Sequence, residues 1–321
     1  MSTEEKCRTE HWAQLREAGT LRGFYFLLWV HRVFGRRIFS IVLYPVMLYF
    51  LLVRKVARRA SLDFLTTHYH FAPGKWETKP GYRHVYRHFM AFGHSILEKL
   101  LAWSSDMTEE EFLLVDPATV EDLHNDPRGQ LIIGTHLGNL EYCRGFMQRY
   151  KNKSINVLLY DQHAANFVKM MQHINGDSRM HVYQVDQLDI PAVLQLKTKI
   201  DNGEWLFIAG DRVPLSGQQR TVDVTMMGRT APVPIGPYML AQTLQCPVKL
   251  MFSYRWEDKV KFQVIPFSER IKLPRKDRDG AIRHHAQAFA HELEKQCIEA
   301  PFQWFNFYFF WSDSPERIEH P

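Results

Sequence analysis

The sequence predicts an α/β fold: a single layered domain with a largely parallel central sheet flanked by helices, preceded by an N-terminal apolar, membrane-associating helical segment. Two observations predict the sheet. Short apolar runs that are typical of buried strands alternate with helical patterns between residues 130 and 209. Such alternation favours parallel strands covered by helices. Hydrophobic residues make up 45% of the chain, which is enough for a substantial core and excludes general disorder.

The N-terminal region predicts a helical segment that associates with a membrane. The chain is strongly apolar over Leu21–Val53, and within this stretch Ile38–Val53 is a run of sixteen residues without a charge. A spanning helix usually needs about 20 apolar residues, and Pro45 lies inside this run. Arginines and lysines stand on both sides, so the positive-inside rule assigns no orientation. We expect residues 1–60 to be a membrane-associating segment, whose short apolar helix lies in, or dips into, one leaflet; a full span and an ordinary buried helix pair are the alternatives.

In chain order, the patterns after this segment predict the following elements, which with their connections fill a domain over residues 61–321. The first half has a polar connection at Ser61–Gly81, a helix at Tyr82–Trp103, a strand at Phe112–Val115, a helix at Val120–His124, a strand at Leu131–Ile133 followed by a helix, a strand at Ile155–Tyr160 and a helix at Ala164–Ile174. The second half has strand-like residues at His181–Val185, a helix at Pro191–Asn202, a strand at Glu204–Ala209, an apolar segment at Thr221–Gly228, a stiff turn at Ala231–Pro237, a short helix at Tyr238–Leu244, a hairpin of Pro247–Tyr254 and Val260–Pro266, and a helix at Asp279–Ala300. The chain closes with an aromatic segment at Pro301–Trp311, which we expect to be buried against the sheet; a contribution to the lipid interface is the alternative.

Charge and cysteine content restrict the class of partner. The net charge is +5 and the pI is about 8.9, which fits an anionic membrane surface or an acidic carrier protein. No RNA-binding signature or Cys/His finger accompanies this charge, so we expect no nucleic-acid partner. The four cysteines are widely separated, which argues against a disulfide framework or a zinc site and favours a reducing cytosol.

Several motifs that would indicate a cofactor or a metal are absent. His84 and His88 lie one helical turn apart, but no third ligand stands nearby, so we expect a solvated basic face. The string HELEK at His291 has Lys295 where a zinc protease needs its second histidine. GxSxG, GxGxxG and GxxxxGK[ST] do not occur, which argues against an esterase nucleophile elbow, a dinucleotide site and a P-loop. We expect neither a metal nor a cofactor.

One stretch has residues in an arrangement that suits catalysis: QLIIGTHLGNLEYCR, which begins at residue 130. Its apolar strand is closed by Gly134 and Thr135 and followed by His136, and Asn139 is a plausible N-cap for a helix that has Glu141 in its first turn. On one continuous helix His136 and Glu141 would point about 140° apart. They can meet if the chain bends at Gly138. A histidine at a strand end, backed by a carboxylate, is a good general base near neutral pH.

The string from His136 to Glu141, with a strand before it and a helix after it, resembles the HxxxxE/D signature of the glycerolipid and lipid A acyltransferases. The lipid A (Kdo-dependent late) acyltransferase branch fits best, over roughly residues 20–311. Asp211 resembles the family's Asp after the equivalent strand, and the closing aromatic segment is also similar. Met226 and Met227 depart from the family's aromatic residues, which leaves the preferred acyl chain length open.

The resemblance implies O-acyl transfer from an acyl thioester, on acyl carrier protein or coenzyme A, to a hydroxyl of a lipid or glycolipid acceptor. His136 would remove the proton from that hydroxyl, while Glu141 would fix the imidazole tautomer and stabilise the imidazolium. The oxyanion would be met by backbone N–H groups near the helix start or by an arginine. A bacterial inner membrane, with the catalytic domain on the cytoplasmic side, is the implied location.

Candidate substrate-binding residues are Asn139, Arg144, Asp211, Arg212 and Arg220. Arg212 and Arg220 can bind a phosphate of the carrier's pantetheine arm or of the acceptor; a solvated loop is the alternative. Ligands of parallel sheets gather beyond the carboxyl ends of the strands. Since His136, Asp161 and Asp211 each follow a predicted strand, we expect them on one edge of the sheet.

Two other functions fit the same residues. The pair His136 and Glu141 could activate water, which would make the protein an acyl-thioester hydrolase. A membrane interaction protein with a degenerate site is the second alternative. Incubation with thioester alone separates the hydrolase from the transferase, because a transferase should release little free acid.

Overall fold

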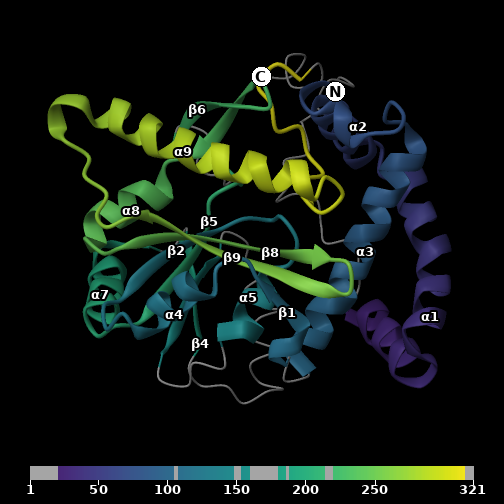
Figure 1. The fold of residues 1–321 in the computed structure, drawn as a ribbon, viewed down its shortest axis with the longest axis horizontal. Coiled ribbons are helices and arrows are strands. Elements are labelled where there is room, and N and C mark those ends of the chain that lie inside the picture. The colour runs from purple at the N-terminus through teal and green to yellow at the C-terminus, as the bar shows by residue number, and fades with distance from the viewer. Residues whose placement is uncertain are drawn as a thin grey trace, which may run out of the picture. The chain divides into compact units, whose positions relative to one another are not determined.

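The computed structural model describes residues 21–104, 108–147, 153–159, 180–185, 188–213 and 220–314 (Figure 1). The helix predicted at Ala164–Ile174 and the expected position of Asp161 lie outside the described residues. Contacts divide the chain into two compact units, which are described separately. The first unit comprises Met1–Leu97, Thr225–Pro232 and Cys297–Pro321, and the second comprises Glu98–Val224 and Val233–Gln296.

A seven-stranded sheet forms the centre of the second unit, in the order β1-β9-β8-β2-β5-β3-β4. Neighbouring strands are parallel except for the hairpin of β8 and β9, so the predicted α/β fold with a largely parallel sheet is confirmed. The strands are β1 (Phe112–Leu114), β2 (Gln130–Gly134), β3 (Ile155–Leu159), β4 (Met180–Gln184), β5 (Trp205–Ala209), β8 (Val248–Trp256) and β9 (Lys259–Ser268).

Helices cover both faces of this sheet (Figure 1). Its described helices include α4 (Pro117–Asn125), α5 (Leu140–Met147), α7 (Ile190–Asp201), α8 (Gly236–Leu244) and most of α9 (Arg278–Glu299), with short 3-10 turns at Glu109–Glu111 and Arg275–Asp277. On the face of α4 and α5, Phe146 stacks on Phe262 at 4.4 Å between ring centroids. On the face of α9, Phe289 packs against Gly210, where an added Cβ would lie 3.0 Å from its ring. Because helices pack on both of its faces, the sheet is a firm support for the residues at the ends of its strands.

Local sequence explains where these helices begin and end. Asp116 caps α4 by accepting from Thr119 N, and Asp189 caps α7 by accepting from Ala192 N; each helix has a proline in its first turn, at the first position of α4 and the second of α7. The helix α8 ends at Leu244, and the residue that caps it, Gln245, adopts the left-handed conformation. The hairpin β8–β9 turns at Glu257 with a positive φ of 55°. These elements agree with the predicted ones.

Two predicted connections are wrong. Ser61–Gly81 was expected to be a polar connection, but Lys55–Phe71 is helix α2, followed by a 3-10 turn at Pro73–Lys75. Its buried residues, among them Ala57, Ala60 and Phe64, are spaced by three, four and seven along one helical face, and the basic and hydroxyl residues between them hide this pattern in the sequence.

The stiff turn predicted at Ala231–Pro237 is also corrected. Arg229–Pro234 is strand β7, which pairs with β6 (Thr221–Met226) in a two-stranded sheet. Met227 and Gly228 connect them with φ of 51° and 76°, the signs that a tight hairpin turn requires. Pro232 and Pro234 are tolerated because a two-stranded sheet leaves each strand one unpaired edge.

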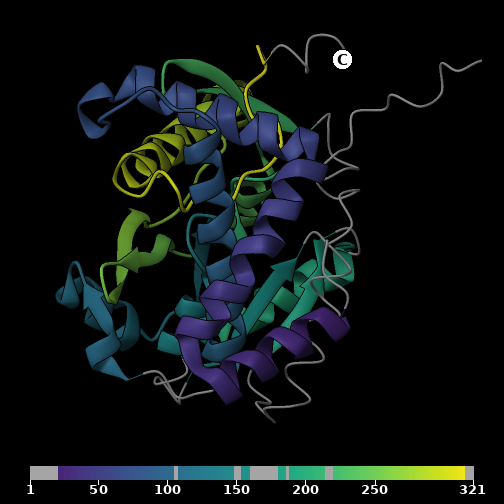
Figure 2. The same cartoon turned by 90° about the vertical axis from the view of Figure 1, so that its right-hand side faces the viewer.

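The first unit contains the apolar N-terminal helix, α1 (Leu21–Val53), which is broken at Gly35 with φ of 76° (Figure 2). Of the described helices, none is by itself long and apolar enough to cross a membrane. Arg37–Val53 and Lys55–Phe71, which meet at a bend of 95°, reach that length and hydropathy only together. This bent pair is a possible membrane segment.

The helix α3 (Tyr82–Ser104) confirms the helix predicted at Tyr82–Trp103, but the expected exposure of His88 is wrong. His88 is fully buried against the rings of Phe64 and Phe307. Its Nε2–H donates to Trp304 O at 3.0 Å, and Ser61 Oγ donates to Nδ1 at 2.9 Å. The closing aromatic segment therefore covers this histidine, and the predicted burial of that segment is confirmed for Trp304, Phe305, Phe310 and Trp311.

Burial lowers the pKa of His88 to about 4, so we expect its protonation to destabilise the protein. The unfolded chain binds this proton near pH 6.5. Stability is therefore complete above that pH and falls as the pH is lowered from about 6.5 to about 4, by about 3 kcal/mol at most. Urea unfolding at several pH values measures the loss. The variant His88→Gln should have a smaller pH dependence, whereas the exposed His291→Gln should keep it; equal slopes in all three proteins would contradict this prediction.

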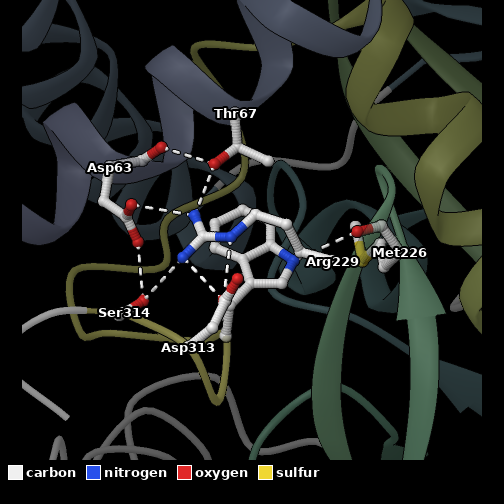
Figure 3. A network of polar contacts seen from close by, with 7 residues as sticks. Asp63, Thr67, Met226, Arg229, Asp313 and Ser314 are labelled. Carbon is white, nitrogen blue, oxygen red and sulfur yellow. Dashed lines mark hydrogen bonds and ion pairs between the residues drawn. The ribbon is translucent and has the colours of Figure 1, made fainter. Parts of the chain in front are cut away.

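An arginine of β7 fastens the C-terminal segment within the first unit (Figure 3). Arg229 donates to Asp63 Oδ1 at 2.8 Å and to Thr67 Oγ1 at 2.7 Å, both in α2. It also donates to Asp313 at 2.9 Å, and its guanidinium lies 4.7 Å above the Trp311 ring. This network joins α2, β7 and the end of the described chain into one unit.

Candidate active site

The site starts from strand β2, whose five residues are all buried between β8 and β5. Because β2 and β5 are parallel and in register, Gly134 pairing with Ala209, the residues after both strands emerge at the same edge. His136 follows β2 and Asp211 follows β5. The structure brings them together, as the strand-end argument predicts.

One carboxylate holds both the backbone and the ring of His136. The backbone N–H of His136 donates to Asp211 Oδ2 at 2.8 Å, and Nδ1 lies 2.8 Å from Oδ1. The Asp211 side chain is 1% exposed and the His136 side chain 28% exposed. The imidazole is thus fixed from behind by a buried acid while part of it reaches solvent.

The protonation state follows from these contacts. Burial, and then the charge of Arg212, lower the pKa of His136 below its usual 6.5, although Asp211 acts in the opposite direction. The ring is therefore neutral at pH 7, and a carboxylate can only accept, so Nδ1 has the proton. Within the described residues no group hydrogen-bonds Nε2, whose lone pair is available for a proton.

Glu141 lies in the first turn of α5, as predicted, with its side chain 13% exposed and 3.9 Å from Lys99 Nζ. The bend that the sequence predicts at Gly138 is present, with φ of 68°. Both hydrogen bonds that the structure gives His136 go to Asp211. A dyad of His136 and Glu141 stays a prediction.

The model of the bacterial lipid A biosynthesis acyltransferase family matches residues 80–312, which include both strand ends and the helix after His136. The chain belongs to this family. It is therefore an acyltransferase of bacterial lipid A biosynthesis type, as the HxxxxE resemblance predicted. No curated protein matches the chain significantly.

The other candidate residues of the acyltransferase lie as follows. Asn139 is buried, and its Oδ1 accepts from Glu141 N at 3.0 Å, so the predicted N-cap is confirmed. Arg144 is part of α5, Arg212 directly follows Asp211, and Arg220 is exposed just before β6. A role of these residues in substrate binding stays a prediction.

Sequence reasoning placed Asp211 among the substrate-binding residues, whereas its hydrogen bonds indicate a partner for the acyltransferase's histidine. Its position at the end of the neighbouring parallel strand was the available signal. Lys99, 37 positions before His136, gave no signal at all, because it is one of several charged residues on a long helix. No group of three or more His, Cys, Asp or Glu suited to a metal occurs among the described residues.

Proposed function

We propose that the enzyme transfers a fatty acyl group from an acyl thioester, on acyl carrier protein or coenzyme A, to a hydroxyl of a lipid or glycolipid acceptor. The observation that supports this most is the geometry of His136, with Nδ1 held by Asp211 at 2.8 Å and Nε2 bonded to none of the residues that the structure describes. A neutral imidazole oriented in this way is a general base at neutral pH.

In the proposed step, Nε2 takes the proton of the acceptor hydroxyl while its oxygen attacks the thioester carbonyl. The carbon–oxygen bond forms, the carbon–sulfur bond breaks, and the proton passes from the imidazolium to the leaving thiolate. Asp211 stabilises the imidazolium in between. No serine or cysteine nucleophile is required, because the thioester is already activated.

Arg212 is the group that we propose for the oxyanion. The sequence left a choice between an arginine and the backbone N–H groups near the start of α5. Three of these groups are used within the protein: Asn139 N donates to Ser253 O, Glu141 N to Asn139 Oδ1, and Tyr142 N to Asn139 O. Arg212 directly follows Asp211, and after burial its positive charge is the next cause of the lowered pKa of His136, which supports a place for this cation beside the reacting groups.

Glu141 is kept in the proposal as the second acid of the site. It stands five residues after His136 and is paired with Lys99, so among the described residues the carboxylates of Glu141 and Asp211 are accompanied by the cations of Lys99 and Arg212. We propose that Glu141 completes a dyad with His136 in the substrate complex through its charge: Nδ1 stays bonded to Asp211 and Nε2 meets the acceptor hydroxyl, while the Glu141 carboxylate stabilises the positively charged imidazole.

The experiment that tests the function uses the purified enzyme with labelled acyl-acyl carrier protein or acyl-coenzyme A and a lipid A precursor in mixed micelles. We expect an acylated lipid, identified by mass spectrometry, and little free fatty acid. Free acid in proportion to thioester consumed, with no acylated lipid, would instead show a hydrolase.

The pH dependence of transfer follows from the pKa of His136. Because that pKa lies below 6.5, kcat/KM should be constant around pH 7 and fall only as the pH drops through the lowered value. The charge of Lys99 contributes to the lowering. Lys99→Met should therefore move the acidic limb of the profile to higher pH, whereas Lys99→Arg should leave it in place. An acidic limb that is identical in all three enzymes would contradict this assignment.

We further propose that α1 attaches the enzyme to the cytoplasmic side of the inner membrane, with residues 1–60 as the membrane-associating segment and 61–321 as the acyltransferase domain. One side of α1 is packed: Leu43 and Met47 lie over Gly93 of α3, where an added Cβ would be 2.9 Å from Leu43. The other side exposes apolar residues, including Ile41, Leu48 and Leu52. A helix with one packed and one exposed apolar side suits insertion into one leaflet.

We expect Ile41→Glu or Leu52→Glu to weaken binding to anionic phospholipid vesicles about tenfold each, since each removes the burial of one large apolar side chain. Vesicle co-sedimentation measures this. Ile190, 78% exposed in the second unit, provides the matched control: Ile190→Glu should bind like the wild type. Equal binding by all variants would exclude α1 as the attachment surface.

A further inference from the structure

The segment that links His136 to α5 is fastened to a strand that contributes no candidate catalytic residue. Gly138 forms an isolated parallel bridge with Ser253 of β8. An added Cβ on Gly138 would lie 2.0 Å from Ser253 O, and φ of 68° is unfavourable for other residues. The backbones therefore approach one another as closely as only glycine permits.

Three hydrogen bonds converge on Ser253 at this bridge. Asn139 N donates to Ser253 O at 3.0 Å, and Ser253 Oγ donates to Asn139 O at 2.8 Å. Cys143 Sγ lies 3.2 Å from Ser253 Oγ. A hydroxyl has one hydrogen, which is used on Asn139, so the thiol is the donor to Ser253.

The environment keeps this arrangement intact. Ser253 is 2% exposed, and burial raises the pKa of the Cys143 thiol to about 12, so the thiol keeps the hydrogen that it donates. The Ser253 hydroxyl thus donates one hydrogen bond and accepts another. Because the site is buried, losing either bond would leave a buried polar group without its partner.

We propose that Ser253 is a positioning residue for acyl transfer, which fixes the Leu137–Asn139 segment and thereby the places of His136 and of the first turn of α5. In the sheet, β2 lies between β5 and β8. Asp211, after β5, holds the imidazole, and Ser253, in β8, holds the chain that follows it. This inference rests on the proposed role of His136, and Ser253 acts through that residue without touching substrate.

Ser253→Ala removes the hydroxyl, and we expect kcat to fall about 10- to 100-fold with KM changed little, because a small displacement of a general base slows the reaction without weakening binding. Ser253→Cys leaves a weaker donor of similar size and should give an intermediate kcat. Acyl transfer to the micellar lipid acceptor is the assay, and thermal unfolding is followed in parallel.

The matched control is Ser61→Ala in the first unit. Ser61 is equally buried and donates to His88, so its replacement should lower thermal stability and leave kcat unchanged. The order Ser, Cys, Ala in kcat at position 253 supports the proposal. A folded Ser253→Ala or Ser253→Cys enzyme with wild-type kcat overturns it. If His136→Ala is inactive in that same assay, the proposed function survives this failure; if His136→Ala is active, the proposed function fails.

Discussion

His136→Ala is expected to lower kcat for acyl transfer by about 10²–10⁴, the range that a general base contributes. Nε2 is the proton acceptor in the proposed step, and alanine leaves nothing in its place. Rates of labelled acyl transfer at pH 7, with saturating thioester and lipid acceptor, measure the effect.

Stability must be separated from chemistry in this variant, because the loss of the ring removes one hydrogen bond from the buried Asp211. His136→Asn is the second variant: its amide can still donate toward Asp211, yet it has no basic nitrogen. Both variants should be folded by circular dichroism and equally inactive. The exposed His291→Ala should keep full activity. Wild-type kcat in either His136 variant would end the general-base proposal.

Asp211→Asn is expected to have an effect of similar size, about 10³–10⁴ in kcat, comparable to the loss of the equivalent acid in serine-protease triads. The asparagine amide would donate to Nδ1 and so stabilise the tautomer with the proton on Nε2. The base would then be occupied by a proton although the geometry is unchanged. Steady-state kinetics at pH 7, with the crystal structure or the thermal stability as a check of the fold, measures this loss.

A comparison with Glu141→Gln shows which carboxylate is the catalytic partner of His136. We expect Glu141→Gln to lower kcat strongly too, through the proposed dyad in the substrate complex, but to leave the acidic limb of the free enzyme's kcat/KM profile nearer to wild type than Asp211→Asn does. If Asp211→Asn retained wild-type kcat while Glu141→Gln abolished it, the histidine would be served by Glu141 alone.

The strands and helices of the α/β domain were predictable because their apolar residues recur at the periods of buried strands and amphipathic helices. The exceptions have local causes. In α2, His68 and Ser61 occupy the buried face beside Phe64, so the apolar pattern is diluted by polar residues. In β7, Pro232 and Pro234 suggest a turn, and only the pairing with β6 makes them part of a strand.

The site was predictable as far as local sequence reaches. His136, its strand, the bend at Gly138 and the N-cap at Asn139 all follow from adjacent residues. The choice of the carboxylate that bonds the ring does not, because Asp211 lies 75 positions away and joins the site through the pairing of β2 with β5. The burial of His88 has the same explanation, since residues more than 200 positions later cover it.

The most direct test of His136 as the general base is the tautomer of its ring, read by ¹⁵N NMR on histidine-labelled enzyme at pH 7, with the signal assigned by its loss in His136→Asn. We expect a neutral ring with the proton on Nδ1 and an unprotonated Nε2. A ring protonated on Nε2, or a positively charged imidazole at that pH, would contradict it.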